Sequence, residues 1–416
     1  MLDIAGVVTG GLCIGCGLCA GIAGRGRLSM LMTPEGRERP VADDGPLPDA
    51  ILERINAVCP GTRIEGARPE TLPADAEIDP VWGPVVPSSL AIVHASDSEV
   101  RYRGASGGVL TALGQYLLGT NEVAAVLHVK ATPDAPMRSV ATVSETPDAV
   151  LDAAGSRYGP AAVLVNLEAL LARGVPFAVI AKPCDIGAVR RMMEIDDRAR
   201  KLVRYCLTLV CGGASDLGKS RSVLDHLGVA EEELRLFRYR GHGNPGLTRI
   251  ETRDGCGFEL TYRDMWADEG AWGIQPRCKI CPDAIGEAAD LVASDCWPGA
   301  DPDGDDDGFN AVMARTETGR RLFEGAVADG VLTVARTIGV RDMDHFQPHQ
   351  VRKKRAVWAR LEGMRAAGMA VPAVHRLRIE ELATLNDEDT NQREMEGARK
   401  RAATGRLGEP PAVAAD

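Results

Sequence analysis

The sequence predicts an α/β protein with a central, largely parallel or mixed sheet, a small cysteine-rich segment before it and a helical extension after it. Two observations lead to this prediction. Apolar, strand-like runs alternate with helical stretches between residues 89 and 345, as in α/β folds. In addition, 416 residues exceed the roughly 250–300 residues that one core usually accommodates. We therefore expect two or three domains.

The expected organisation has five parts. Residues 1–70 are glycine-rich and weakly periodic, so they bury little apolar surface alone, and a bound metal cluster would stabilise them. Residues 71–88 belong to a proline-rich stretch and predict a linker. Residues 89–345 form the α/β domain, and residues 346–385 a helical extension whose apolar side chains pack on it. Residues 386–416 are polar, charged and alanine-rich and predict a disordered tail.

Within the α/β domain, the alternation of apolar runs and helical patterns gives a specific order of elements. The expected strands cover residues 90–95, 123–129, 175–181 and 202–210, and the expected helices cover residues 106–118 and 164–172. Ligands in such sheets bind beyond the carboxyl ends of the strands, so residues that follow strands are the candidates for function.

Composition excludes several classes of function. The net charge of −11 argues against binding to nucleic acid or to an anionic membrane surface. No apolar run is long enough for a transmembrane helix and the N-terminus lacks a signal pattern, so we expect a cytoplasmic protein. Thiols stay reduced in that compartment, and the eleven cysteines are better explained by metal binding, catalysis or burial than by disulfides.

The first cysteine set lies near the N-terminus. It has the spacing C-x-x-C-x-x-C, is interleaved with Gly15 and Gly17, and is completed by a distant Cys-Pro pair; its members are Cys13, Cys16, Cys19 and Cys59. This spacing is typical of a ferredoxin-like loop that binds a [4Fe-4S] cluster. The fourth cysteine lies forty residues away, which indicates one cluster closed by a long loop. A structural zinc site is the alternative.

A glycine-rich stretch, residues 103–111, precedes an amphipathic helix. Ser106 is a candidate N-cap, and Gly107 and Gly108 allow backbone N–H groups to approach an anion at the helix N-terminus. The stretch therefore predicts a phosphate-binding site. The alternative is an ordinary helix N-terminus preceded by glycines that binds no phosphate, because glycine-rich loops are weak evidence for a phosphate site.

Four further cysteines are candidates for a second set. Cys184 and Cys211 follow strand-like runs, and Cys278 and Cys281 form a C-x-x-C step. Because strand ends meet at one edge of a sheet, these thiols can converge on one site. The alternative is that they are separate buried thiols, since metal ligands must converge in space.

Two phosphate-binding patterns compete with this interpretation. Residues 213–220 match the P-loop pattern G-x-x-x-x-G-K-S after a strand-like run, which makes an NTPase an alternative. Ser215 can instead cap the following helix. Residues 241–246 match G-x-G-x-x-G, but an alternating strand follows where a dinucleotide site requires a helix. That loop is expected to line a flavin or substrate crevice near Arg238 and Arg240, or to be a tight turn.

Taken together, these residues resemble the coenzyme F420 hydrogenase/dehydrogenase beta-subunit family, which includes relatives that reduce chlorophyll-type pigments. The resemblance covers about residues 10–345. The matching stretches are CIGCGLC (13–19), CPG (59–61), WGP (82–84), RGASGGVLTALGQYLL (103–118), GSRYGPA (155–161), KPCDIGAVR (182–190), LVCGG (209–213) and RCKICPDAIGEAADLVASD (277–295).

The resemblance implies an iron–sulfur flavoprotein that binds FAD and two [4Fe-4S] clusters. The residues of the implied flavin site are Ser106, Gly107, Gly108 and Thr111 in one segment, and Gly155, Ser156, Arg157 and Tyr158 in another. The second cluster falls on Cys184, Cys211, Cys278 and Cys281.

The implied activity is that of an oxidoreductase. Electrons from a ferredoxin-type partner would reach FAD through the clusters and leave as a hydride to a small molecule, either an F420-like deazaflavin or a conjugated double bond. Lys182 is a candidate for contact with the reduced flavin or substrate, or forms an ion pair with Asp185. His242 is a candidate proton donor. A non-catalytic, zinc-stabilised interaction protein is the alternative function, and a homo-oligomer is left open.

Overall fold

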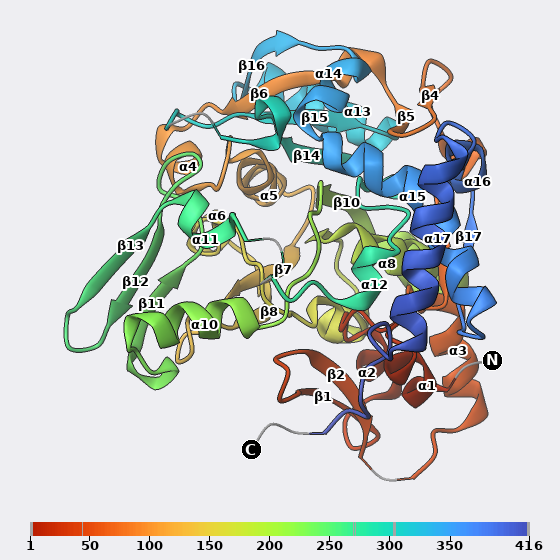
Figure 1. The fold of residues 1–416 in the computed structure, drawn as a ribbon. Coiled ribbons are helices and arrows are strands. Elements are labelled where there is room, and N and C mark those ends of the chain that lie inside the picture. Colours follow the sequence, from red (N-terminus) through yellow and green to blue (C-terminus); the bar gives the residue numbers. More distant parts are fainter. Residues whose placement is uncertain (1–2, 44, 269, 271, 303–304, 414–416) are drawn as a thin grey trace.

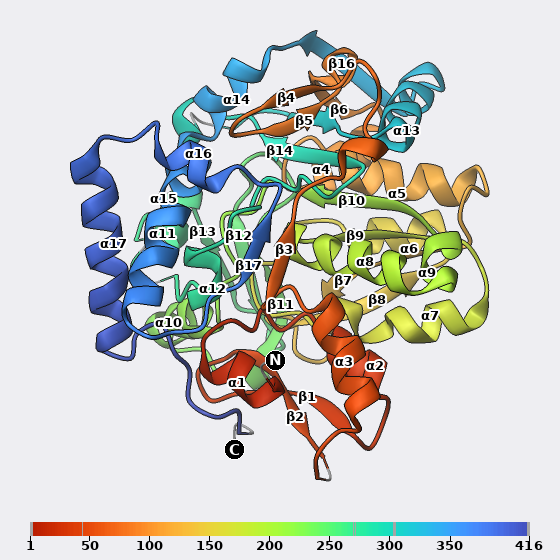
Figure 2. The same ribbon diagram turned by 90° about the vertical axis from the view of Figure 1, so that its right-hand side faces the viewer.

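The computed structural model describes residues 3–43, 45–268, 270, 272–302 and 305–413. An eight-stranded mixed sheet runs through the molecule, with helices on both faces (Figures 1 and 2). In the order in which they pair, its strands are β16 (Leu332–Thr337), β6 (Ala91–Ala95), β15 (Asn310–Ala314), β14 (Leu291–Asp295), β10 (Val203–Leu209), β9 (Phe177–Ala181), β7 (Ala125–Ala131) and β8 (Ser139–Ser144). This architecture confirms the predicted α/β class with a mixed central sheet.

Four neighbouring strands in the middle of the sheet, β14, β10, β9 and β7, run parallel. The strands outside them pair in antiparallel fashion. The helices between and beside the strands are α4 (Ser98–Arg103), α5 (Val109–Gly119), α6 (Pro147–Asp152), α7 (Leu167–Arg173), α8 (Pro183–Ile195), α9 (Asp197–Leu202), α10 (Gly218–Leu227) and α13 (Glu317–Ala328).

Side chains of the strands alternate between two cores, one on each face of the sheet. Leu291 and Ala293 of β14 pack with α5 and α13 on one face, whereas Val292 packs with α8 on the other. This alternation follows from the two-residue period of a strand. Because both faces are covered, most strands read as continuous apolar runs, which is why they could be located from the sequence.

The N-terminal segment packs beneath the sheet domain (Figure 2). It contains α1 (Ile4–Thr9), α2 (Leu18–Ala23), α3 (Asp49–Val58), the β1–β2 hairpin (Leu28–Met32 and Glu38–Ala42) and β3 (Arg63–Glu65). Ile14, Leu18 and Val58 from this segment join the core that also contains α8. The segment therefore shares apolar packing with the sheet domain.

The proline-rich stretch 71–88 contains a short hairpin, β4 (Glu77–Asp79) with β5 (Gly83–Val85). Trp82 in its turn is fully buried. A second, three-stranded sheet, β11 (Leu234–Arg238), β12 (Thr248–Thr252) and β13 (Gly257–Leu260), extends to one side of the central sheet (Figure 1). Its β12–β13 turn contains Gly255, which has φ +96°.

The C-terminal extension consists of α14 (Val340–Phe346), α15 (Pro348–Ala366), β17 (Ala373–His375), α16 (Ile379–Ala383) and α17 (Glu388–Ala403). Buried charges attach it to the domain. Lys354 donates to the carbonyl of Val81 and to Glu287, and Arg378 also pairs with Glu287. The Glu287 carboxylate is fully buried, so the two cations compensate its charge.

The prediction of a disordered tail differs from the structure. Residues 388–403 form α17, which packs along α15 (Figure 1), and Leu407 beyond it is buried. Residues 414–416 lie outside the described residues. Ala398 and Leu407 supply the apolar contacts. They are too few and too widely spaced to stand out in a polar sequence, so composition alone suggested disorder.

Two local predictions also differ. Ser106 does not cap α5; Gly108, with φ +72°, holds the N-cap position, and the Ser106 hydroxyl donates to the Phe309 carbonyl. Ser215 does not cap α10, whose N-cap is Leu217. Among the described residues, no helix is both long and apolar enough to cross a membrane.

Candidate functional site

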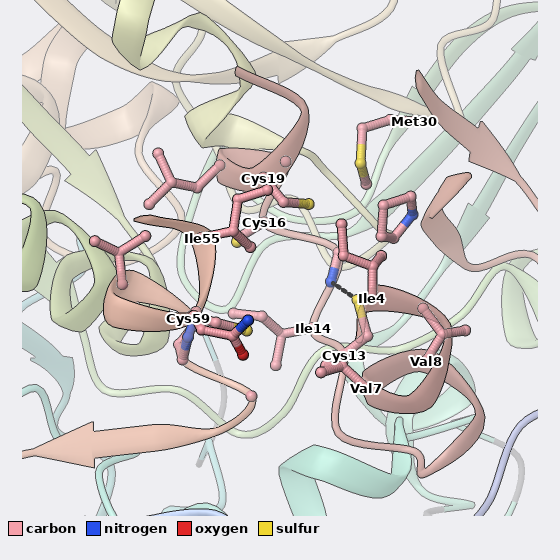
Figure 3. A pocket seen from close by; sticks show the side chains of 18 residues that line it. Ile4, Val7, Val8, Cys13, Ile14, Cys16, Cys19, Met30, Ile55 and Cys59 are labelled. Atoms are coloured by element: carbon pink, nitrogen blue, oxygen red, sulfur yellow. Dashed lines mark hydrogen bonds between the residues drawn. The ribbon is translucent and has the colours of Figure 1, made fainter. Parts of the chain in front are cut away.

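The four cysteines of the first set surround one apolar cavity of about 40 Å³ (Figure 3). Cys13 and Cys16 lie in the loop between α1 and α2, Cys19 lies in the first turn of α2, and Cys59 ends α3. Apolar side chains complete the lining, namely Ile4, Val7, Val8, Ile14, Met30 and Ile55. Because these side chains exclude water, any charge in the cavity must be compensated locally.

Two glycines shape this loop. Gly15 has φ +68°, and a Cβ atom there would lie 2.5 Å from the Glu38 carbonyl oxygen. Gly17 has φ +80°, and its Cβ atom would lie 2.8 Å from that of Ala162. The Gly15 N–H also donates to the Cys13 sulfur at 3.4 Å. Both positions require glycine, as expected where backbone amides approach sulfur closely.

Burial makes the thiolate forms of this set unfavourable. It raises the pKa of the Cys13 thiol to about 11, although the nearby Arg39 lowers it. The pKa values of Cys16 and Cys19 are also raised by burial. Thiolates are the metal-binding form, so a positively charged metal centre is what would stabilise this donor set.

The structure also brings the second set together from distant parts of the chain. Cys184 lies in the first turn of α8 after β9, Cys211 follows β10, and Cys278 lies in α12 (Pro276–Lys279), with Cys281 just beyond it. Burial, and then the charges of Cys278 and Cys281, raise the pKa of Cys211 to about 11. Cys211 and Cys281 in turn contribute to the raised pKa of Cys184. Cys211 therefore lies within electrostatic range of the other three thiols.

Backbone and side-chain contacts hold the second set in place. The Ala214 N–H donates to the Cys278 sulfur at 3.3 Å, and the Cys211 N–H donates to the Ala284 carbonyl. The amide of Gln350 in α15 donates to the Cys211 carbonyl at 2.9 Å. Within the described ranges, no three His, Cys, Asp or Glu side chains are grouped as the ligands of a single metal ion.

Lys182 lies beside the second set. Its ammonium group is 2.7 Å from Asp185, whose side chain is fully buried. Burial lowers the pKa of Lys182, but Asp185 and the neighbouring cysteines outweigh this effect and raise it. Lys182 is therefore a fixed positive charge in an ion pair, which is the alternative that the sequence left open.

The two predicted flavin segments meet at Arg240. Its guanidinium donates to the Ala105 carbonyl, next to Ser106, and to the Tyr158 hydroxyl at 3.2 Å. It also pairs with Asp295 at 3.0 Å and lies 4.6 Å from the centre of the Trp297 ring. The sequence indicated Arg240 only as a neighbour of a glycine-rich loop. Its bridging role depends on long-range contacts.

The remaining predicted flavin residues have different environments. Gly107 and Gly108 pack tightly, since a Cβ atom on either would lie within 2.8 Å of backbone atoms. Thr111, Gly155 and Ser156 are half-buried. All three guanidinium nitrogens of Arg157 donate to protein oxygens, including the carbonyls of Pro136 and Phe237. Its donors are therefore already engaged in joining β8 to β11.

His242 is an exposed residue in the otherwise mostly buried loop between β11 and β12, and its ring lies against that of Tyr102. Burial and the nearby Arg238 and Arg103 lower its pKa. The imidazole is therefore neutral at pH 7, which suits a proton acceptor better than a donor.

The P-loop pattern does not form a phosphate cradle here. The N–H groups of Ala214, Asp216, Leu217 and Gly218 donate to the Cys278 sulfur, the Gly273 carbonyl, the Gly36 carbonyl and the Asp216 carboxylate, respectively. These are amides that a P-loop would direct at phosphate. The other pattern, at residues 241–246, leads into β12, as predicted.

The pairing of β10 with β14 relates the second cysteine set to the Arg240 region. These parallel neighbours align Leu209 with Ala293. Cys211 lies two residues beyond the end of β10, and Asp295, the partner of Arg240, ends β14. Their carbonyls accept hydrogen bonds from Gln350 and Gln347, respectively, at the start of α15. Adjacent strands are about 4.8 Å apart. The second cysteine set and the predicted flavin crevice are therefore neighbours at one edge of the sheet.

Comparison with known proteins places the chain in a family. Two parts of the chain match the family described as coenzyme F420 hydrogenase/dehydrogenase, beta subunit. Residues 91–168 match the N-terminal part of that family, and residues 176–339 match its C-terminal part. These ranges cover more than half of the chain.

Individual relatives are more distant. The chain is 26% identical over 249 residues to the F420-dependent formate dehydrogenase subunit beta of Methanocaldococcus jannaschii, covering 58% of this chain and 60% of that protein. It is 23% identical to the coenzyme F420 hydrogenase subunit beta of Methanococcus voltae, covering 67% and 95%. The match thus spans about 60% of the length of the formate dehydrogenase relative.

A solved structure shares the fold. A chain of the F420-reducing [NiFe] hydrogenase complex from Methanosarcina barkeri superposes with a TM-score of 0.50 and 22% identity, covering 68% of this chain and 96% of that one. The residues outside the family ranges include the first cysteine set and the C-terminal extension. From the two family matches, the chain belongs to the coenzyme F420 hydrogenase/dehydrogenase beta-subunit family.

Proposed function

We propose that this chain is an iron–sulfur flavoprotein oxidoreductase that binds two [4Fe-4S] clusters and FAD. Electrons would enter from a ferredoxin-type partner and leave as a hydride to a small molecule. The observation that carries the proposal is that Cys211 and Asp295 lie at the carboxyl ends of the neighbouring parallel strands β10 and β14, where Gln350 and Gln347 of one helix start bond to them.

The donor chemistry of the cysteine sets fits clusters. Each set offers four thiols, and soft thiolate ligands favour iron–sulfur centres or zinc. The first set would be Cys13, Cys16, Cys19 and Cys59, and the second Cys184, Cys211, Cys278 and Cys281. A glycine loop with an amide donating to sulfur, as at Gly15, is a further feature of iron–sulfur sites.

The residues around Arg240, where the sequence predicts a crevice, have the chemistry to bind a polar, aromatic ligand such as a flavin. Among the described residues, the indole N–H groups of Trp266 and Trp297 and the side-chain oxygen of Asn244 are buried without a hydrogen-bond partner. A bound ligand with polar ring edges would satisfy such groups. When bound, FAD would supply the exchange between single electrons and a hydride.

The chain's own residues would bind and orient. Arg240 holds the Ala105 and Tyr158 segments together, so both sides of the crevice keep a fixed spacing. Lys182 maintains a positive charge beside the second set. His242 would accept or relay a proton at the rim of the crevice.

The relatives favour F420 over a conjugated double bond as the small molecule, because both proteins compared above carry F420 in their names. The solved relative comes from a hydrogenase complex, so a larger subunit is a second candidate for the electron-transfer partner. The first cysteine set lies outside the family ranges, and it favours a chain that receives electrons from a ferredoxin by itself.

The test is anaerobic purification followed by visible spectroscopy and quantitation of iron, sulfide, zinc and flavin. We expect a brown protein with about eight iron atoms and bound FAD per chain. We also expect this protein to transfer hydride to or from F420. Zinc in a colourless protein would instead support the alternative function, a non-catalytic, zinc-stabilised interaction protein. Nucleotide binding that disappears in Lys219→Ala would support the NTPase.

A further inference from the structure

Arg39 on β2 is fully buried between the two cysteine sets. Its Nε and Nη2 atoms each lie 2.7 Å from a carboxylate oxygen of Glu409. Nη2 also donates to the Gln275 side chain at 2.8 Å, and Nη1 donates to the Glu38 carbonyl at 2.9 Å. Every nitrogen of the guanidinium is therefore engaged, and its position is fixed.

These contacts connect Arg39 to both sets. On one side, Nη1 lies 3.2 Å from the position of a Cβ atom on Gly15, within the loop of the first set. On the other side, Gln275 is the N-cap of α12, which carries Cys278 of the second set. The same guanidinium also interacts electrostatically with the thiols of Cys13 and Cys278. One positive charge is thus shared between the two sets.

Glu409 belongs to the C-terminal tail. The backbone N–H of Glu409 donates to the Thr9 carbonyl at 3.0 Å, and a Cβ atom on Gly11 would lie 1.8 Å from the Leu407 carbonyl oxygen. The side chain of Glu409 is only 3% exposed, and Arg37 lies 3.4 Å from it on the outer side. The tail is therefore packed tightly against the loop that holds Cys13.

A charge at this place acts on any redox centre held by the cysteines. A nearby positive charge stabilises the reduced, more negative state and raises the reduction potential, whereas a negative charge lowers it. Because the pair is buried, water and salt screen it little. Removing either partner therefore changes the local charge at both sets at once.

We propose that Arg39 and Glu409 form a charge pair that sets the reduction potentials of both cysteine-bound centres, with the C-terminal tail supplying the negative partner. This inference rests on the proposed function, since it requires iron–sulfur clusters in both sets. Arg39 and Glu409 lie outside residues 91–339, the part of the chain that the family ranges span. The pair is therefore a feature that the family match does not predict.

The experiment is a redox titration of the full-length, iron-loaded protein, followed by electron paramagnetic resonance. Glu409→Gln keeps the side-chain shape but leaves Arg39 uncompensated, so both cluster midpoints shift to more positive values. Arg39→Gln leaves Glu409 and shifts both to more negative values. The double variant, which removes both charges, returns the midpoints toward those of the wild type.

Glu396→Gln on the exposed face of α17 is the matched control, because it removes the same charge far from buried partners. Its midpoints should equal those of the wild type. Wild-type midpoints in Glu409→Gln and Arg39→Gln, at full iron content, would overturn the inference but leave the proposed function intact. Iron-free wild-type protein would instead overturn the proposed function.

If Glu409→Gln does not retain iron, the variant Arg37→Gln tests the inference instead. Arg37 is 17% exposed and lies on the outer side of the same carboxylate. Arg37→Gln removes a cation that partly neutralises Glu409, so the midpoint of the first set should become more negative. An unchanged midpoint there would overturn the inference.

Discussion

The first cysteine set lies within one short loop and the end of one helix, whereas the second is assembled from two strand ends and a short helix almost one hundred residues apart. The first is enclosed by apolar side chains. The second has Lys182, Asp185 and Gln350 as neighbours. The first set thus depends on local backbone shape, and the second depends on the register of the sheet.

The largest expected effect separates the roles of the two sets in catalysis. With a small chemical reductant, Cys278→Ser should reduce the rate of flavin reduction at least about 100-fold, because the second set adjoins the crevice. Cys13→Ser should retain most of that rate but lose the reaction with a ferredoxin-type donor. Stopped-flow absorbance measures both.

Cys256→Ser serves as the control for these variants, since Cys256 is exposed and belongs to neither set. Equal losses in Cys13→Ser and Cys278→Ser with the chemical reductant would contradict the proposed order of the two sets.

The next effect concerns the long-range contacts around the second set. Arg240→Met leaves Asp295 without its partner and separates the Ala105 and Tyr158 segments. We expect a loss of about 3 kcal/mol in the free energy of unfolding and weaker retention of flavin. Chemical denaturation and gel filtration measure these losses.

Arg263→Met is the matched control, because the Arg263–Asp301 pair is exposed on both sides. Its effect should stay below about 1 kcal/mol. If both arginine variants behaved alike, Arg240 would not hold the crevice together.

Substitution of glycines tests the dependence of the first set on local backbone shape. Gly15→Ala places a methyl group against the Glu38 carbonyl at a positive φ, so unfolding should become easier by about 1–2 kcal/mol or more. Gly212→Ala beside the second set has open space and should change stability by less than about 0.5 kcal/mol. Thermal unfolding of both holo-proteins gives the comparison, and a stable Gly15→Ala would contradict it.

The effect that is smallest at pH 7 is a pH dependence away from both sets, which appears only on acidification. Burial lowers the pKa of His128 to about 4, below the value near 6.5 in the unfolded chain. Its neutral form, hydrogen-bonded to Ser144, is therefore favoured by folding. Stability is fully present above pH 6.5 and falls as the pH drops toward 4, by at most about 1.4 kcal/mol per pH unit.

His128→Gln should flatten that slope while leaving the metal content unchanged. Denaturant midpoints measured between pH 4 and 7 compare the two proteins. An unchanged slope in the variant would assign the acid sensitivity to other groups.

The same contrast explains what the sequence could predict. The spacing of Cys13, Cys16 and Cys19 is local, and the buried strands are continuous apolar runs, so both could be recognised directly. The second set could be suggested only from strand ends and the family resemblance. Arg240 pairs with Asp295, which lies 55 positions away in sequence, and Arg39 pairs with Glu409, which lies 370 positions away. No local sequence pattern marks such pairs.

In the C-terminal tail, the prediction from composition differs from the structure. Polar composition suggested disorder, yet a few contacts by Ala398, Leu407 and Glu409 suffice to dock it. Leu407 and Glu409 contact the N-terminal segment at Gly11 and Arg39, whereas Ala398 packs on α15. Tertiary contacts therefore decide the structure of this segment.

The central claim is that two separate four-cysteine sets each hold an iron–sulfur cluster. Iron and sulfide quantitation, with electron paramagnetic resonance of the reduced protein, in wild type, Cys13→Ser and Cys278→Ser tests it most directly. Each variant should lose about half of the iron and keep the signal of the other set. Iron content that is zero in the wild type, or unchanged in both variants, would contradict the claim.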